Sequence, residues 1–353
     1  MSILIFFIVL SVLVIVHELG HFLAARAFGV RVDEFGLGYP PRARKLFKWR
    51  GTLFTLNWLP FGGFVKIFGE DPSEENLKSA ESFQTKNRGI QAAVLAAGVF
   101  FNLIFAWILI SVALAIGLPA PAGLTIPIEN PQTVVTTVVP NSPAAEAGLK
   151  SGDAILTING AKVMPEDAVR IITDATGPLD FEVSRGKTTS HFYMLPKEGI
   201  VEGHKAVGIS MEIVGTTKLS LIKSFWEGAK ITYELTILTT KALVGFVAKA
   251  FIGRADLSNV TGPVGLVGLV GDARELGFGY LLSFVAMISL NLSLINLLPF
   301  PALDGGRLLF VLVETVTRRR VPARVFNLSN SVGFALLVIL MILVTVHDVK
   351  SVF

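Results

Sequence analysis

Cysteine is absent from this chain of 353 residues, and charged residues are scarce. Without cysteine the chain can form neither disulfides nor thiolate metal ligands, so a bound metal ion would need histidine, aspartate or glutamate. Charged residues make up 16% of the chain, whereas an ordinary soluble domain has about 25%. Hydrophobic residues make up 52%, and the mean hydropathy is +0.64. This composition indicates a membrane protein.

The charge balance is basic, with a formal net charge of +4 and an isoelectric point near 9.2. Nucleic-acid binding is one possible reason for such a balance. However, the arginines and lysines cluster beside apolar segments, as the topology signals of membrane proteins do. We therefore expect a lipid bilayer, and no nucleic acid, as a partner.

Four largely apolar segments are long enough to cross a bilayer, which takes about 20 residues. Arginine and lysine are concentrated in the loops after the first and third segments, which predicts that both loops are cytoplasmic. Both termini and the region between the second and third segments would then be extracytoplasmic. The segments are residues 3–28, 92–118, 278–298 and 325–346.

The region between the second and third segments holds one small mixed domain, predicted at residues 125–215. Short β-branched runs alternate there with turn signals such as Asn159-Gly160. Residues 220–252 follow with a helical pattern that mixes lysines and aromatics, which favours an amphipathic helix on the outer membrane surface over a fifth span. The predicted fold is a polytopic α-helical membrane protein with four transmembrane helices and one inserted α+β domain. Residues 1–118 and 278–353 would form the two halves of its membrane domain.

The sequence His17-Glu-Leu-Gly-His21 lies inside the first apolar segment. On a helix this spacing places two imidazoles on one face, where they can hold one zinc ion. Glu18, between them, can reach the open metal position and serve as general base. These residues predict a zinc hydrolase whose site lies within the membrane.

A catalytic zinc ion usually has three protein ligands, and Asp304 is the candidate for the third. An ionisable side chain within the membrane costs free energy, so its presence there indicates a functional site. Asp304 follows a segment that runs inward, as the segment of His17 does, so both would lie near the cytoplasmic face. Pro299 and Pro301 just before it break the helix, and irregular backbone at this depth requires surrounding protein or a water-filled cavity.

The two motifs together resemble those of the site-2 protease family, the intramembrane zinc metalloproteases of peptidase family M50. The closest likeness is to bacterial members with one PDZ domain, and it covers nearly the whole chain. The resemblance implies that His17, His21 and Asp304 bind one Zn²⁺ ion and that Glu18 is the catalytic acid and base. It also implies that Asn291, Asn296 and Asn102 line the substrate path.

This resemblance implies an enzyme of the bacterial cytoplasmic membrane that cuts single-span membrane proteins. Its biological role would be regulated intramembrane proteolysis or clearance of signal-peptide remnants. The domain at 125–215 resembles a circularly permuted PDZ domain, and its loop Val207-Gly208-Ile209 matches the one that binds a peptide C-terminus. The zinc site would lie toward the cytoplasmic side.

Residues 54–68 form a predicted membrane-associated hairpin with a turn at Gly62-Gly63. A transmembrane substrate must unwind before cleavage, because a helix hides its carbonyl groups in its own hydrogen bonds. The edge of this hairpin, from Gly62 and Gly63 to Phe64, could pair with the unwound substrate by strand addition.

Two other functional classes remain open from the residues alone. A transporter can use buried histidine, glutamate and aspartate as an ion or proton path, although the sequence has no evident inverted repeat. A membrane adaptor with a PDZ domain and a silent metal site is the other class, although Glu18 is present. Of the three classes, we expect this chain to be a zinc endopeptidase.

Overall fold

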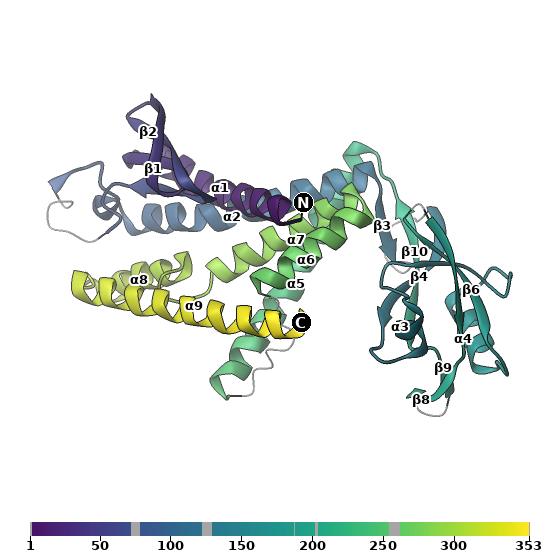
Figure 1. The fold of residues 1–353 in the computed structure, drawn as a ribbon. Helices are drawn as coiled ribbons and strands as arrows, with labels where there is room; N and C mark the ends of the chain where they lie inside the picture. The colour runs from purple at the N-terminus through teal and green to yellow at the C-terminus, as the bar shows by residue number, and fades with distance from the viewer. Residues whose placement is uncertain are drawn as a thin grey trace. The chain divides into compact units, whose positions relative to one another are not determined.

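The structure is a computed structural model that describes residues 2–71, 78–121, 129–186, 188–201, 204–253 and 262–352. The chain divides into two compact units (Figure 1). The membrane unit comprises Met1–Ser111, Phe225–Asp272 and Leu282–Phe353. The inserted unit comprises Val112–Ser224 and Ala273–Leu281. The predicted start of the inserted domain, residue 125, lies outside the described residues.

Long apolar helices dominate the membrane unit, and five helices of the described chain are long and apolar enough to cross a membrane. Four of them overlap the predicted segments. The fifth, α5, is the least hydropathic, with a value of 1.3 against 1.9 to 2.7 for the others. Length and composition alone therefore do not confirm the four-span topology. The helices are α1 (Ser2–Ala27), α2 (Arg88–Ile116), α5 (Leu221–Phe251), α6 (Pro263–Leu276), α7 (Phe278–Asn296), α8 (Asp304–Thr317) and α9 (Ala323–Val352).

Strands β1 (Val32–Trp49) and β2 (Thr52–Ile67) pair with each other twice, because each strand bends. Residues 34–37 have partners in 53–56 and also in 63–66. Residues 53–56 in turn pair with 44–48. The two strands therefore form four rows in the order 63–67, 32–37, 53–56, 44–49. Among the described residues, rows 63–67 and 44–49 each have one partner row and form the edges.

This arrangement corrects the predicted hairpin at 54–68. The tight turn of the hairpin lies at Arg50-Gly51, where φ is 46° and 92°, and Gly62-Gly63 is instead a bend within β2. A two-residue turn in which both residues have positive φ matches the right-handed twist of the flanking strands. The bend at Gly62 also has a positive φ, of 70°. The presence of glycine therefore did not show which of Gly51 and Gly62 lies in the hairpin turn.

Aromatic rings attach this sheet to α1. Phe22 of α1 lies 5.6 Å from Phe35 and 5.8 Å from Phe54, measured between ring centroids, in edge-to-face geometry. Phe54 also stacks on Phe47 at 4.5 Å. Such pairs contribute about 0.5–1.5 kcal/mol each beyond burial. Because Phe22 follows His21 directly, this cluster anchors the metal-binding end of α1 to the sheet.

The inserted unit is built on a six-stranded sheet with the order β3-β10-β4-β5-β6-β7. Its core includes the fully buried Phe181 and Ile158, and helix α4 covers the core with Ala168 and Ile172. Buried Asp153 accepts two hydrogen bonds of 2.6 Å from Arg185. The strands and helices are β3 (Leu118–Pro121), β4 (Glu129–Val138), α3 (Pro143–Ala147), β5 (Ala154–Ile158), α4 (Pro165–Thr173), β6 (Leu179–Arg185), β7 (Thr188–Met194), β8 (Lys197–Val201), β9 (His204–Ala206) and β10 (Ile209–Thr217).

Candidate metal centre

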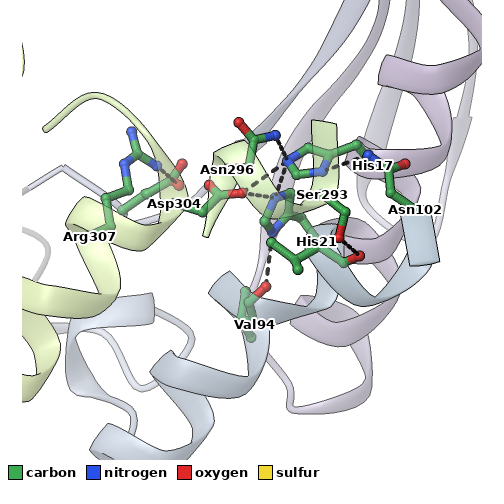
Figure 2. Close-up of polar contacts among 10 residues, drawn as sticks. His17, His21, Val94, Asn102, Ser293, Asn296, Asp304 and Arg307 are labelled. Atoms are coloured by element: carbon green, nitrogen blue, oxygen red, sulfur yellow. Dashed lines mark hydrogen bonds and ion pairs between the residues drawn. The ribbon is translucent and has the colours of Figure 1, made fainter. Parts of the chain in front are cut away.

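Three side chains converge inside the membrane unit (Figure 2). His17 and His21 lie one turn apart on α1 and are buried, each with 7% exposure. Asp304, the first residue of α8, faces them. The structure thus brings together the three residues that the sequence predicts as ligands, from two helices separated by most of the chain.

The donor atoms have the spacing that a small tetrahedral cation requires. Oδ2 of Asp304 lies 2.9 Å from Nε2 of His17 and 3.3 Å from Nε2 of His21. The two Nε2 atoms are 3.2 Å apart. Ligands at about 2.0–2.1 Å from a tetrahedral zinc ion lie about 3.3 Å from one another. Oδ2 of Asp304 is also buried without a hydrogen-bond partner among the described residues. This donor set fits one zinc ion.

Hydrogen bonds from α2 orient both imidazoles. Nδ1 of His21 donates to the carbonyl oxygen of Val94 at 2.9 Å, which leaves the lone pair of Nε2 free for a metal. Nδ1 of His17 lies 3.4 Å from the side-chain amide of Asn102. The amide oxygen of Asn102 is buried and has no partner among the described residues. Reversing the amide would let this oxygen accept the Nδ1 proton of His17.

Two glycines allow this close approach of α1 and α2. A Cβ atom on Gly98 would lie 2.7 Å from Cε1 of His17 and even closer to Nε2 of His21. A Cβ atom on Gly20 would lie 2.8 Å from the carbonyl carbon of Ala97. Real Cβ contacts essentially never fall under 3.0 Å. Gly98 therefore matters for the site, although sequence reasoning made no claim for it.

The segment between α7 and α8 holds Asp304 in place. Gly305 and Gly306 pack directly against backbone carbonyls of residues 297–300. Side-chain oxygen Oδ1 of Asn330, from α9, accepts a hydrogen bond from the backbone of Ala302 at 3.1 Å. Ala302 has a φ of 75°, so the backbone is strained there. Protein groups thus surround this irregular backbone, as its depth requires.

Helix α7 is attached to α2 by two buried serines. Ser289 donates to the carbonyl of Asn102 at 2.8 Å, and Ser293 donates to that of Val99 at 2.9 Å. One turn further, the amide of Asn296 lies 3.5 Å from Nε2 of His17. Asn291 makes no polar contact with the histidines among the described residues. The structure therefore brings Asn296 and Asn102 to the centre, but not Asn291.

Glu18 lies on the same part of α1 and is partly buried. Its carboxylate is within electrostatic range of His17, His21 and Asp304. No described group forms a hydrogen bond with it. Glu18 is thus available to a substrate or a water molecule beside the three donor atoms.

The predicted substrate-contact residues of β2 lie beside α1. A Cβ atom added to Gly62 would lie 3.2 Å from Cγ1 of Val14. A Cβ atom added to Gly63 would lie 3.7 Å from Cγ1 of Ile15. Phe64 follows in the edge row 63–67. This edge row therefore runs next to the turn of α1 that precedes His17.

The predicted peptide loop of the inserted unit precedes β10. The backbone carbonyls of Val207 and Gly208 accept hydrogen bonds from Ala144 and Val139. Gly208 has a φ of 83°, and a side chain there would strike Ser142. Ile209 begins β10, whose residues 209–213 pair with β4 on one side, whereas β3 covers only residues 214–217 on the other. The other edge of 209–213 is unpaired within the described part of the chain.

Sequence reasoning missed one charged pair near the centre. Arg307, one turn after Asp304 on α8, forms an ion pair with Glu70, just after β2. Burial raises the pKa of the Glu70 carboxyl above its usual range, and the charge of Arg307 opposes this shift. The pair lines a cavity of about 370 Å³ with a second pair, Arg88 and Glu314. The only signal in the sequence was that Arg307 lies three residues after Asp304, a predicted metal ligand.

Comparisons with known proteins agree with the geometry. The profile of "Peptidase family M50" matches residues 5–340. "Putative zinc metalloprotease CPE1693" of Clostridium perfringens is 38% identical over 347 residues, which cover 96% of each chain. A Helicobacter pylori protein of similar name is 32% identical, with 97% of each chain covered. "Zinc metalloprotease RasP" of Geobacillus kaustophilus is 28% identical, with 100% of this chain and 98% of the relative covered.

Proposed function

The chain belongs to peptidase family M50 and is a zinc metalloprotease, and from this premise we propose that it cleaves other membrane proteins within their transmembrane segments. One observation carries the proposal. The three donor atoms converge at α1, whose two histidines also contact α2 and α7, and all three of these helices are long and apolar enough to span a bilayer. A peptide bond must lie at this depth to be cut, and membrane-spanning segments supply such bonds.

His17, His21 and Asp304 would hold the zinc ion, and Glu18 would move the proton. A bound zinc ion supplies a Lewis acid and a water molecule of lowered pKa. Glu18 would accept a proton from the attacking water and would later donate it to the leaving amine. The carbonyl of Val94 keeps His21 in the tautomer that offers Nε2. With its amide reversed, Asn102 would do the same for His17. Asn296 lies close enough to contact the substrate beside His17.

The edge row 63–67 would hold the substrate as an added strand. A transmembrane helix must unwind to expose a carbonyl group, and a strand edge can satisfy the backbone groups that unwinding frees. The contacts of Gly62 and Gly63 with Val14 and Ile15 support this role, because they bring the edge beside the helix that carries His17 and Glu18.

Proline scanning tests the added strand. Proline at residues 64–67 should slow cleavage at the positions whose N–H faces the substrate, by about fivefold to tenfold, because about one hydrogen bond is lost. Proline at residues 45–48, in the opposite edge row, is the matched control and should leave cleavage near the wild-type rate. Equal effects in both rows would contradict strand addition.

The inserted unit would select substrates outside the membrane by binding a peptide C-terminus. The unpaired edge of residues 209–213 supports this role, since it continues from the loop Val207-Gly208-Ile209. Regulated intramembrane proteolysis or clearance of signal-peptide remnants follows if the selected substrates have already been trimmed by another protease.

Contacts within the membrane unit support four membrane crossings, with α5 on the outer surface. α1 and α2 run antiparallel, since His17 meets Asn102 and His21 meets Val94. The start of α1 and the end of α2 therefore lie at the same end of the unit. The start of α5 is attached to this end of α2 by a hydrogen bond of 2.8 Å from Trp107 to the carbonyl of Phe225.

Helix α6 lies at this same end of the unit. Backbone N–H groups of Gly262 and Gly265 donate to Asp348, near the end of α9. Gly271 of α6 packs against Ser2, at the start of α1. Because the segment from α5 to α6 begins and ends at one face, a single crossing by α5 is disfavoured. By the charge pattern of the loops, this face would be extracytoplasmic.

The decisive experiment compares the purified wild-type chain with Glu18→Gln on a single-span test substrate in detergent. We expect the wild type to cleave and the variant to lose activity while still binding one zinc ion, measured by plasma mass spectrometry. A zinc chelator should also stop the wild type. Equal cleavage by Glu18→Gln, or cleavage that ignores the chelator, would overturn the proposal.

A further inference from the structure

The ion pair Glu70–Arg307 joins the two segments that carry the edge row 63–67 and the metal ligand Asp304. Glu70 is three residues after Ile67, the last residue of the edge row 63–67. Arg307 is three residues after Asp304, the first residue of α8. The side chains are largely buried, with exposures of 19% and 29%, and Figure 2 shows Arg307 beside Asp304.

Backbone contacts hold the Glu70 end of this pair in place. Phe68 donates a hydrogen bond to the carbonyl of Arg31 at 2.9 Å, and Phe83 donates one to that of Phe68 at 2.9 Å. Gly69 has a φ of 76° and packs against Ser82 without room for a side chain. The turn that carries Glu70 therefore has a defined position at the end of β2.

The Arg307 end is equally defined, because α8 begins at Asp304 and Arg307 lies on its next turn. The backbone N–H of Arg307 donates to the carbonyl of Leu303 at 3.2 Å. Its guanidinium is within electrostatic range of Asp304 and Glu18. The cavity of about 370 Å³ lies beside the pair. Val311 of α8 also belongs to the apolar cluster that contains Ile67 of the sheet, and the ion pair adds a charged link between α8 and the end of β2.

We propose that Glu70 and Arg307 are positioning residues that fix the edge row 63–67 relative to the metal ligand Asp304. This inference rests on the proposed function, since it assumes that the edge row holds the substrate. A peptide on this edge must present its carbonyl group to a metal held by Asp304. An error of about 1 Å in such an alignment can cost about 100-fold in rate. The ion pair between the two elements limits that error.

The chain supplies a matched control in the second ion pair of the same cavity. Arg88 of α2 and Glu314 of α8 lie 2.6 Å apart. Glu314 is at the far end of α8 and also accepts a hydrogen bond from the backbone of Val321 at 2.7 Å. Its loss would weaken packing of α8 without moving Asp304 relative to the edge row. Glu314→Gln thus separates a stabilising ion pair from a positioning one.

The test measures kcat, KM and zinc affinity for Glu70→Gln, Arg307→Gln, their double variant and Glu314→Gln. Partners that orient metal ligands change affinity or activity by about 10-fold to 100-fold. We expect each single variant to lower kcat by about 10-fold, with a smaller change in KM, and the double variant to be no worse than either single one. Glu314→Gln should keep the wild-type kcat.

If a charge-removing variant does not fold, a conservative variant tests whether the ion pair positions the two elements. Glu70→Asp keeps the charge but shortens the side chain by one methylene group, so it shifts the two elements without deleting the pair. A lowered kcat with unchanged thermal stability supports positioning. Wild-type kcat in Glu70→Asp, multiplied losses in the double variant, or an equal loss in Glu314→Gln would overturn it. Absence of any cleavage by the wild type would instead overturn the proposed function.

Discussion

Gly98 shows how closely the metal centre depends on a single missing side chain. Both imidazoles occupy the space that a Cβ atom of this residue would take. Gly20 plays the same part between the helix backbones, where it faces Ala97. Small residues let membrane helices approach closely, because packing rather than water exclusion holds such helices together. Here the close approach also lets α2 orient the two histidines.

Gly98→Ala should therefore disable the site. The added methyl group must displace His17, His21 or the whole of α2, so we expect zinc affinity and cleavage to fall by at least about 10-fold. Zinc content by plasma mass spectrometry and the rate of cleavage measure this effect. Gly89→Ala, on the same helix but away from the imidazoles, is the control. Full zinc content in Gly98→Ala would show that the helices can separate without harm.

Asn102→Ala should weaken metal binding without removing a ligand. The amide of Asn102 is the described polar group within reach of Nδ1 of His17. Its loss frees the imidazole to rotate or to adopt the other tautomer, at a cost of about 10-fold to 100-fold in zinc affinity. Competition with a chelating dye measures that affinity. Asn327→Ala, at an exposed position of α9, should bind zinc as the wild type does.

At the scale of elements, α7 is attached to α2 through Ser289 and Ser293, which lie one turn apart. Both hydroxyl groups donate to carbonyls of the turn that carries Asn102 and Val99. Interhelical hydrogen bonds in membrane proteins contribute about 0.6 kcal/mol each on average. The serines therefore stabilise the helix pair modestly and set its register along the axis.

The double variant Ser289→Ala/Ser293→Ala should lose about 1 kcal/mol of unfolding free energy. Unfolding in mixed micelles with increasing dodecyl sulfate measures this loss. The rate of cleavage should fall as well, because Asn296 and the segment before Asp304 continue from α7. Ser331→Ala, exposed on α9, serves as the reference. Unchanged stability in the double variant would mean that the hydroxyl groups find equivalent partners in the separated helices.

At the scale of the whole molecule, the two proposed tasks, catalysis and substrate choice, fall on different compact units. All three donor atoms and Glu18 belong to the membrane unit, whereas the loop Val207-Gly208-Ile209 belongs to the inserted unit. Strands β3 and β10 pair through residues 118–121 and 214–217 where the inserted unit joins the helices. We therefore expect that catalysis and substrate choice can be changed independently.

Replacing residues 122–213 with Asn-Gly should preserve zinc binding and abolish substrate choice. The replacement keeps the paired residues 118–121 and 214–217 and closes them with a two-residue hairpin turn. We expect wild-type zinc content, and equal cleavage of substrates with trimmed and with full-length outer domains. The wild type should prefer the trimmed form. Retained preference in the shortened protein would place substrate choice in the membrane unit.

Absence of cysteine makes the membrane topology directly measurable. Lys162 of the inserted unit and Arg319, after α8, are exposed and can each be replaced by a single cysteine. A membrane-impermeant maleimide should label Lys162→Cys in intact cells and Arg319→Cys only after permeabilisation, because arginine-rich loops stay in the cytoplasm. The unmodified chain provides a background without labelling. Reversed labelling would contradict the predicted sidedness.

Local pattern accounts for most of what sequence reasoning predicted about the fold and the site. Helical spacing alone places His17 and His21 on one face, and uninterrupted apolar runs predict long helices. Turn chemistry was less informative. Arg50-Gly51 and Gly62-Gly63 both contain glycine with positive φ, and only the pairing of distant rows shows which of them is the hairpin turn.

By itself, then, the sequence determined the apolar helices, the histidine pair and the candidate carboxylate, because these follow from spacing and burial cost along the chain. Only the tertiary structure decided that Asn102 rather than Asn291 reaches the histidines, that Gly98 must lack a side chain, and that Glu70 meets Arg307. These are contacts between elements far apart in the chain. Their geometry depends on how helices and strands pack, and no local spacing encodes it.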